Sequence, residues 1–360
     1  MTSSFYSQLR VTIMTFPAIK TAIIGYGFSA TTFHIPFINT LPEFEFTAVS
    51  TRNREAVNRD WPNVQHYESA QDLLNHSDAE LVIITAPNDV HFELAKQALE
   101  NGKHVIIEKP FVTNIADGEA LIALAAEKNR ILSVYHNRRW DGDFLTIKKM
   151  IEEKRCGELK HYESHFDRFR PDVRQRWREQ ATNGGGLLFD LGSHLIDQAL
   201  ALFGVPDAIT AQCEIMREGS TNVDYFNIVL HYPNHLATLH GDLFSAGPNK
   251  RFTLKGTQGS YEKYGLDPQE ACLIAGVLPN KPQWANETSE QYGRFYDADG
   301  VETITTESGC YQQYFQELAL AINTNTAPPV TATDALWNIK LIALAMESSR
   351  QGKTLTIDKW

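Results

Sequence analysis

Two distant places in the chain carry side chains that together could oxidise an alcohol. Lys109 lies in the run Glu108-Lys109-Pro110, and Asp190 and His194 follow three consecutive glycines. A histidine beside a carboxylate can take a hydroxyl proton as a general base. A lysine can hold the reacting oxygen and stabilise the negative charge that develops on it. We therefore predict that Lys109, Asp190 and His194 are catalytic, with Asp190 binding a neighbouring hydroxyl or orienting His194.

The spacing of the second group predicts a helix. Asp190 and His194 are four residues apart, so they would share one face of a helix over Leu187–Phe203, and Asp197 would continue that face. The alternative is a capped or salt-bridged polar stripe on the surface. Lys109 alone would be an ordinary loop lysine, but the proline after it ends the preceding strand and would hold it at the rim of a sheet.

The elements that must position these side chains alternate between two patterns in the first third of the chain. Short apolar runs alternate with segments of helical spacing such as His91–Asn101 and Asn114–Lys128. This alternation is typical of βαβ units and a parallel sheet, and ligands bind at the carboxyl ends of such strands. The predicted strands are Thr21–Ile24, Phe46–Ser50, Leu81–Thr85, His104–Ile107 and Ile131–Tyr135.

A glycine pattern follows the first predicted strand. In Gly25-x-Gly27-x-x-Ala30, the first glycine permits a tight turn, the second admits a pyrophosphate, and the alanine lets the next helix pack closely. The strand context favours a dinucleotide site over a glycine-rich turn of some other α/β protein. The predicted contacts in this turn are Gly25, Tyr26, Gly27, Phe28 and Ser29.

The end of the second predicted strand bears on the choice of cofactor. An NAD enzyme usually has an acidic residue there to bind the ribose hydroxyls, but this chain has Ser50-Thr51-Arg52. Thr51 is a small hydroxyl residue, and Arg52 can pair with a 2′-phosphate. We therefore favour NADP over NAD, the alternative being that Arg52 and Arg54 form a solvated loop.

The pattern changes after about residue 138. A helix over Phe144–Glu153 and a strand over His161–Phe169 precede the helix that carries His194. Closely spaced strands follow, which indicates a mostly antiparallel sheet, and two helices, Tyr311–Ile322 and Ala332–Arg350, come near the end of the chain. The predicted strands of this sheet are Ile209–Met216, Tyr225–His231, Leu236–Leu243, Arg251–Lys255 and Ser260–Lys263, with Thr354–Ile357 returning as a further strand.

Length and composition limit the number of domains and the kinds of partner that we expect. The 360 residues predict two domains, and we divide the chain into an extension (1–17), a Rossmann domain (18–138) and a substrate-binding and oligomerisation domain (139–360). The net charge of −11 argues against a nucleic-acid partner or a polybasic membrane anchor. No apolar run is long enough to span a membrane. The four scattered cysteines fit a reducing cytoplasm and predict no metal site.

The motifs resemble the glucose–fructose oxidoreductase/inositol dehydrogenase/rhizopine catabolism family, abbreviated Gfo/Idh/MocA. The resemblance covers nearly the whole chain from about Lys20 and rests on the glycine turn, Pro87-Asn88-x-x-His91, Glu108-Lys109-Pro110 and Asp190-x-x-x-His194. It implies a Rossmann domain followed by an α/β domain with an open, mostly antiparallel sheet. It also implies the catalytic trio named above and a homodimer or homotetramer assembled through the open sheet.

Two segments look like the NADP-dependent scyllo-inositol dehydrogenase branch of this family, namely Gly27–Pro36 and Phe166–Arg178. Relatives imply cofactor contacts for a Trp-Arg pair in the second segment and for a tyrosine that opens the penultimate helix. With the ends of the parallel strands, the further predicted cofactor contacts are Thr85, Pro87, Asn88, His91, Glu108, Lys109, Asn137, Trp177, Arg178 and Tyr311.

The sequence leaves three functions open. The first is an NADP-dependent dehydrogenase of a cyclic polyol such as scyllo-inositol, or of a sugar. The second is a reductase of another aldose, keto-sugar or dihydrodiol on the same scaffold, because a fold does not fix its substrate. The third is a non-catalytic NADP-sensing protein, against which the retention of Lys109, Asp190 and His194 weighs.

Overall fold

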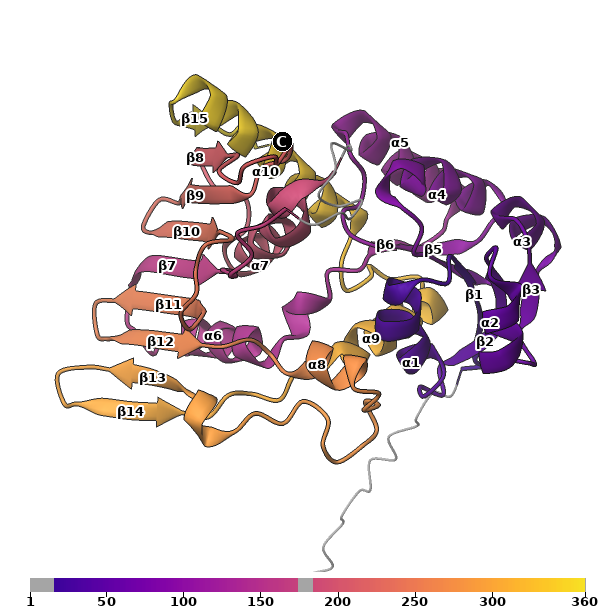
Figure 1. Cartoon of the computed structure of the whole chain (residues 1–360), viewed down its shortest axis with the longest axis horizontal. Helices are drawn as coiled ribbons and strands as arrows, with labels where there is room; N and C mark the ends of the chain where they lie inside the picture. The colour runs from indigo at the N-terminus through magenta and orange to yellow at the C-terminus, as the bar shows by residue number, and fades with distance from the viewer. Residues whose placement is uncertain (1–15, 174–183, 360) are drawn as a thin grey trace, which may run out of the picture.

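The computed structural model describes residues 16–173 and 184–359. These residues form two parts, each built on one sheet, with the parallel sheet on the right of Figure 1 and the larger sheet on the left. Most of the predicted N-terminal extension and the segment with Trp177 and Arg178 lie outside the described residues.

The first sheet has the order β3-β2-β1-β4-β5-β6, and each neighbouring pair of strands is parallel. The order reverses between β1 and β4, which creates the crevice where ligands of such sheets bind. The five predicted strands correspond to five of these six, and the polar three-residue β3 was not among them. The strands are β1 (Ile19–Ile24), β2 (Phe44–Ser50), β3 (Gln65–Tyr67), β4 (Leu81–Ile84), β5 (His104–Ile107) and β6 (Leu132–Val134).

Helices connect these strands. Three of them begin at a side chain that accepts a hydrogen bond from a free backbone N–H: Asn53, Ser69 and Asn114. The first connection departs from a regular α-helix, because it opens as the π-helical segment η1 (Ala30–His34) and continues as α1 (Ile35–Ile38). The others are α2 (Arg54–Asp60), α3 (Ala70–His76), α4 (His91–Glu100) and α5 (Ile115–Lys128).

The second sheet has nine strands in the order β14-β13-β12-β11-β7-β10-β9-β8-β15. Only the β7/β10 pair is parallel, so the prediction of a mostly antiparallel sheet is confirmed. The strands are β7 (Leu159–His165), β8 (Ala208–Glu214), β9 (Tyr225–His231), β10 (Leu236–Gly241), β11 (Lys250–Gly256), β12 (Ser260–Tyr264), β13 (Gly293–Tyr296), β14 (Val301–Ile304) and β15 (Leu355–Thr356).

The helices of the second part lie between its sheet and the Rossmann part, which leaves the other face of the sheet open (Figure 1). The predicted helix over Leu187–Phe203 is present, but it contains a π-helical segment over Leu188–Gly192 (η5) before it continues as the α-helix Ser193–Phe203 (α7). The remaining helices are α6 (Gly142–Glu152), α8 (Gln269–Ile274), α9 (Tyr311–Thr324) and α10 (Ala332–Gln351).

Two hydrophobic cores correspond to the two sheets. The first core also takes in Tyr314, Phe315 and Leu318 from α9, although the sequence prediction assigned that helix to the second domain. Phe315 stacks on Phe37 of α1 with ring centroids 5.0 Å apart. The chain therefore returns to the Rossmann part after β14 and before the last strand, β15, which fixes the two parts against each other.

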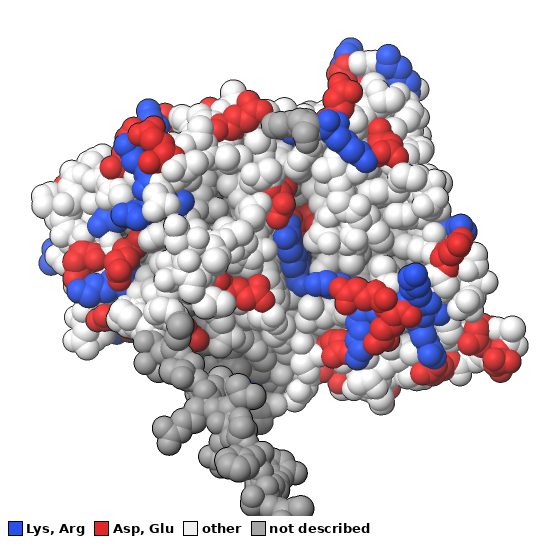
Figure 2. Space-filling view, turned by 180° about the vertical axis from the view of Figure 1, so that it is seen from behind, with Lys and Arg blue, Asp and Glu red and all other residues white. Residues whose placement is uncertain are grey.

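The distribution of charge on the surface and the apolarity of the helices are relevant to nucleic-acid and membrane partners. Figure 2 shows lysine and arginine intermixed with aspartate and glutamate over the face behind Figure 1, rather than gathered in one basic patch. Among the described residues, none of the helices combines the length and the apolarity that crossing a bilayer requires.

Candidate active site

A cavity of about 420 Å³ lies where the carboxyl ends of the parallel strands face the second part. Its lining includes Lys109 from the end of β5 and both Asp190 and His194 from the η5–α7 segment. The three residues predicted as catalytic therefore meet at one cavity. Of the predicted cofactor contacts, Phe28, Ser29, Glu108, Lys109 and Asn137 also line it.

Lys109 is held by Asp190. Its Nζ lies 2.9 Å from Asp190 Oδ1 and donates to the Asp190 backbone carbonyl oxygen at 2.7 Å. The lysine side chain is 13% exposed, and the aspartate side chain is 28% exposed. One edge of the ion pair therefore remains open to a ligand in the cavity.

His194 lies one turn further along, near the start of α7, and is 5% exposed. Burial lowers the pKa of His194 well below its ordinary value, and the positive charge of Lys109 lowers it further. Its Nδ1 is buried and has no hydrogen-bond partner among the described residues. A neutral imidazole at a cavity wall is the form that can accept a proton from a substrate hydroxyl.

The carboxylate next to His194 in the predicted stripe has a different task. Asp197 is 1% exposed and accepts two hydrogen bonds from Arg139, at 2.7 and 2.9 Å. It does not line the cavity. Although Asp197 was expected to continue the face of Asp190 and His194, it does not reach the cavity, and its ion pair with Arg139 fastens α7 to the segment after β6.

The glycine turn has the geometry that its sequence predicts. Gly25 has a φ of 101°, and a Cβ on it would lie 2.7 Å from Thr85 Oγ1, so a side chain is excluded there. A Cβ on Gly27 would meet nothing within 4 Å, which leaves open space over that backbone. This opening fits the pyrophosphate of a dinucleotide, whereas Thr85 supports the turn by donating to the Ile24 carbonyl oxygen at 3.1 Å.

Glu108 joins the turn to the end of β5. It accepts hydrogen bonds from Ser29 Oγ, from His34 Nε2 at 2.9 Å, and from the backbone N–H of Lys109 at 3.0 Å. Burial alone would raise the pKa of Glu108, but these donors and the charge of Lys109 lower it to about 2. The carboxylate therefore positions both the first helix and Lys109, in addition to lining the cavity.

The predicted nucleotide-specificity residues lie at the end of β2, away from the cavity lining. Arg52 is exposed, and Thr51 is partly exposed with its backbone N–H bound to the Tyr67 carbonyl oxygen. Tyr26 lies in the glycine turn and donates to Asp60 Oδ2 at 2.9 Å. These positions leave Arg52 available to an anion at the outer end of the glycine turn.

The segment after β4 connects neighbouring turns and does not line the cavity. His91 is fully buried, and its ring nitrogens face the carbonyl oxygens of Pro110 at 2.9 Å and Ala86 at 3.0 Å. It therefore ties the turn after β4 to the turn after β5, rather than reaching the cavity. Asn88, which follows Pro87, donates to the Gly184 carbonyl oxygen at 3.2 Å and so connects the two parts of the chain.

Tyr311 opens α9 as the sequence predicts, but it is fully buried and donates to Asp141 Oδ1 at 2.6 Å. It is not part of the cavity wall, and its contact with the cofactor stays a prediction. Trp177 and Arg178 lie outside the described residues.

Several residues that line the cavity were not predicted. Tyr135 follows β6, so its place at the carboxyl end of a parallel strand was a signal that could have identified it. Arg168 and Arg170 follow β7, within the segment Phe166–Arg178 whose resemblance to relatives could have marked them. Arg217 comes from a loop and Glu270 from α8, and nothing local in the sequence marks either of them. Only the packing of the two parts brings them to this wall.

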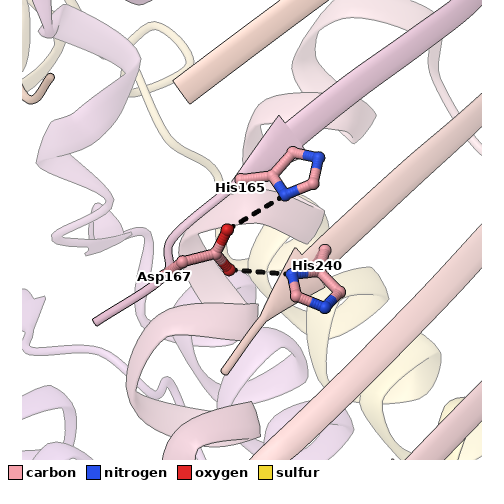
Figure 3. Close-up of side chains that lie close together, drawn as sticks. All are labelled: His165, Asp167 and His240. Carbon is pink, nitrogen blue, oxygen red and sulfur yellow. Dashed lines mark hydrogen bonds and ion pairs between the residues drawn. The ribbon is translucent and has the colours of Figure 1, made fainter. Parts of the chain in front are cut away.

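A second polar cluster lies beyond the cavity on strands of the second sheet. Asp167 accepts from His240 Nδ1 at 2.8 Å and lies 3.2 Å from His165 Nδ1 (Figure 3). The register pairs His165 of β7 with His240 of β10, which sequence spacing could not reveal. Histidine and aspartate can bind metals, but hydrogen bonding accounts for this arrangement.

A parallel sheet with a glycine turn, facing a lysine, a carboxylate and a neutral histidine, defines a nicotinamide-dependent oxidoreductase. Residues 19–136 match the family described as "Oxidoreductase family, NAD-binding Rossmann fold", and residues 148–357 match "Oxidoreductase family, C-terminal alpha/beta domain". The chain belongs to the Gfo/Idh/MocA oxidoreductase family, which confirms the predicted fold and enzyme class.

Relatives of known sequence and structure span almost the whole chain. It is 41% identical to the uncharacterized oxidoreductase YdgJ of Escherichia coli, over 94% of this chain and 99% of the other. It is 40% identical to scyllo-inositol 2-dehydrogenase (NADP(+)) IolW of Bacillus subtilis, over 94% and 96%. The solved structure of the oxidoreductase yvaA from Bacillus subtilis superposes with a TM-score of 0.92 at 39% identity, covering 96% of this chain and all of the other.

Proposed function

We propose that this oxidoreductase uses NADP to transfer a hydride to or from a secondary alcohol of a cyclic polyol or sugar. The observation that carries the proposal is the meeting of Lys109, Asp190 and His194 at one cavity beside the glycine turn. The similarity to a scyllo-inositol 2-dehydrogenase over nearly the full length supports a polyol as substrate.

The residues divide the chemistry between them. Lys109, held by Asp190, binds the substrate oxygen and stabilises negative charge on it. His194, kept neutral by burial, accepts the hydroxyl proton during oxidation and returns it during reduction. When bound, the nicotinamide supplies the hydride acceptor or donor. The Lys109–Asp190 pair also fixes the lysine between the two parts of the chain, so little reorganisation is needed when the substrate binds.

The open space at Gly27 is where the cofactor pyrophosphate would lie, and Arg52 is the residue that would hold a 2′-phosphate. No acidic residue stands at the end of β2 to accept from ribose hydroxyls, which favours NADP over NAD. The relative from Bacillus subtilis is named as an NADP enzyme, which supports the same choice.

The open face of the second sheet supports a homodimer or homotetramer. Its helices cover only the face toward the Rossmann part (Figure 1). Outward residues of β7 such as His161 and Glu163 are only partly exposed, and this face would be further covered by a second copy of the chain.

A cofactor and substrate panel tests the proposal. Initial rates with NADP and NAD are measured for inositol isomers, hexoses, aldoses and dihydrodiols in both directions. Turnover of a polyol or sugar with NADP is the expected result. Preferred reduction of a dihydrodiol would favour a different reductase, and cofactor binding with no turnover would favour an NADP-sensing protein.

A further inference from the structure

The part of the cavity wall that the second part of the chain supplies carries two arginines, Arg168 and Arg170, just after β7. Their backbone is fixed by two hydrogen bonds. The backbone N–H of Arg168 donates to the carbonyl oxygen of Asp242 at 3.1 Å, and that of Arg170 donates to the carbonyl oxygen of Leu243 at 2.8 Å. The Arg168 guanidinium lies over the ring of Phe166 at 4.9 Å. Both side chains are therefore presented to the same cavity as Lys109 and His194.

The other cations of this cavity are neutralised by carboxylates. Lys109 pairs with Asp190 at 2.9 Å. Two further pairs are Arg138 with Glu270 at 2.6 Å, and Arg217 with Asp224 at 3.0 Å. Within residues 16–173 and 184–359, no carboxylate makes an ion pair with Arg168 or Arg170.

The local electrostatics favour a further anion. Burial lowers the pKa of Arg168, and the neighbouring charge of Arg170 lowers it further, whereas the charges of Asp190 and Glu270 oppose this shift only in part. A partly desolvated cation without a partner is unfavourable, and a bound anion relieves that cost. The cavity wall holds five cationic side chains and three carboxylates, although the chain as a whole has a net charge of −11.

We infer that Arg168 and Arg170 form an anion-binding subsite, and that the substrate is an acidic polyol or sugar bearing a carboxylate or a phosphate. The inference rests on the proposed function and narrows its substrate class. The planar guanidinium of Arg168 matches either group through paired hydrogen bonds. Because the subsite shares a cavity with Lys109 and His194, the anion and the oxidised alcohol belong to one small molecule.

The glycine turn and the arginines stand on different parts of the chain. The pyrophosphate of a dinucleotide is accommodated at Gly27, at the N-terminal end of the η1–α1 segment. Arg168 and Arg170 belong to the second part, beyond His165 of β7. Capture of a cofactor phosphate by these arginines is the competing outcome, and the experiment separates it.

The test uses matched substrates with NADP: a neutral hexose, its uronic acid and its monophosphate, together with an inositol and its monophosphate. We expect kcat/KM for an acidic member to exceed that of its neutral counterpart at least about tenfold. In Arg168→Gln the ratio of kcat/KM between the acidic and the neutral member should fall toward one, because the KM for the acidic member rises. The Kd for NADP should stay near the wild-type value. Arg168→Lys keeps part of the preference because it keeps the charge.

Arg155→Gln is the matched control. Arg155 also lies over a phenylalanine ring, that of Phe295 at 5.0 Å, but it pairs with Glu302 on the surface away from the cavity. This variant should retain the wild-type preference. The acid preference should also weaken as salt is raised, because added ions screen the arginines.

Two results would overturn the inference. One is equal turnover of neutral and acidic members that Arg168→Gln leaves unchanged, and the other is an Arg168→Gln effect confined to a higher Kd for NADP. If no member is turned over, the proposed function fails, and thermal shift with inorganic phosphate and a uronate decides the subsite separately. A rise in the melting temperature of the wild type with these anions that is lost in Arg168→Gln supports the subsite. An unchanged melting temperature in both the wild type and the variant overturns it.

Discussion

The Nζ of Lys109 and the carboxylate of Asp190 lie 2.9 Å apart, although the two residues are 81 positions apart in the chain. A strand end of the Rossmann part and a π-helical segment of the second part supply them. π-Helical turns occur frequently at functional sites because the extra residue alters where side chains point. The ion pair places a charged group at the boundary of the two parts, where a substrate can reach it.

Lys109→Ala should lower kcat/KM by about 100-fold or more, because it removes the cation that stabilises charge on the substrate oxygen. The Kd for NADP, measured by fluorescence titration, should change much less. Steady-state kinetics with the best substrate of the panel provides the measurement. Unchanged activity in this variant would refute the proposed role of the lysine.

His194→Asn should lower kcat by about 100- to 10,000-fold, the usual contribution of a general base. Because burial lowers the pKa of His194, the base stays unprotonated below pH 6.5. The wild-type profile of kcat/KM for oxidation should therefore fall only at a pH well below that value. A profile that begins to fall near pH 7 would contradict a buried neutral base.

Glu108→Gln tests the carboxylate that joins Ser29, His34 and Lys109. The folded pKa of Glu108, about 2, is below its ordinary value of 4.5, so its stabilisation is fully present above pH 4.5 and is lost as the pH falls toward 2. We expect a loss of about 1 to 3 kcal/mol in the free energy of unfolding at pH 7, with a smaller loss near pH 3. Urea titration at the two pH values measures it, and equal losses at both would contradict the assignment.

Asp197→Ala separates a structural role from a catalytic one. Breaking this buried ion pair leaves Arg139 with only the more exposed Asp334, at 3.5 Å. The loss should therefore approach the cost of breaking a buried pair, about 3 to 5 kcal/mol. The melting temperature should fall, whereas kcat per folded molecule at low temperature should stay within a few-fold of the wild type. Asp207→Ala, which removes an exposed ion pair with Lys359, is a control of the same chemistry. A selective collapse of kcat in Asp197→Ala would contradict this purely structural role.

Arg52→Ala tests the cofactor choice. If Arg52 pairs with the 2′-phosphate, the KM for NADP should rise about tenfold or more while the KM for NAD changes little, because NAD lacks that group. Arg54→Ala, two residues along the same loop, controls for the general charge of the segment. Equal effects of Arg52→Ala on both cofactors would mean that the arginine belongs to a solvated loop.

The sequence by itself determined the local features. Gly25 and Gly27 predicted the turn, because the backbone conformation that a residue allows and the space that it leaves for a ligand are properties of that single residue. The alternation of apolar runs predicted five strands of the parallel sheet. The family motifs identified Lys109, Asp190 and His194, which the structure brings to one cavity. The short strand β3 was missed because Gln65–Tyr67 has no apolar run and exists through its pairing with β2.

Only the tertiary structure decided which side chains meet. The spacing of Asp190, His194 and Asp197 indicated one shared helix face. In the structure, the π-helical turn and long-range packing pair Asp190 with Lys109, and Asp197 with Arg139. The same packing brings Arg168 to the cavity and pairs His165 with His240. Partners of buried charges are fixed by contacts between elements distant in the chain, and a pattern of neighbouring residues does not contain that information.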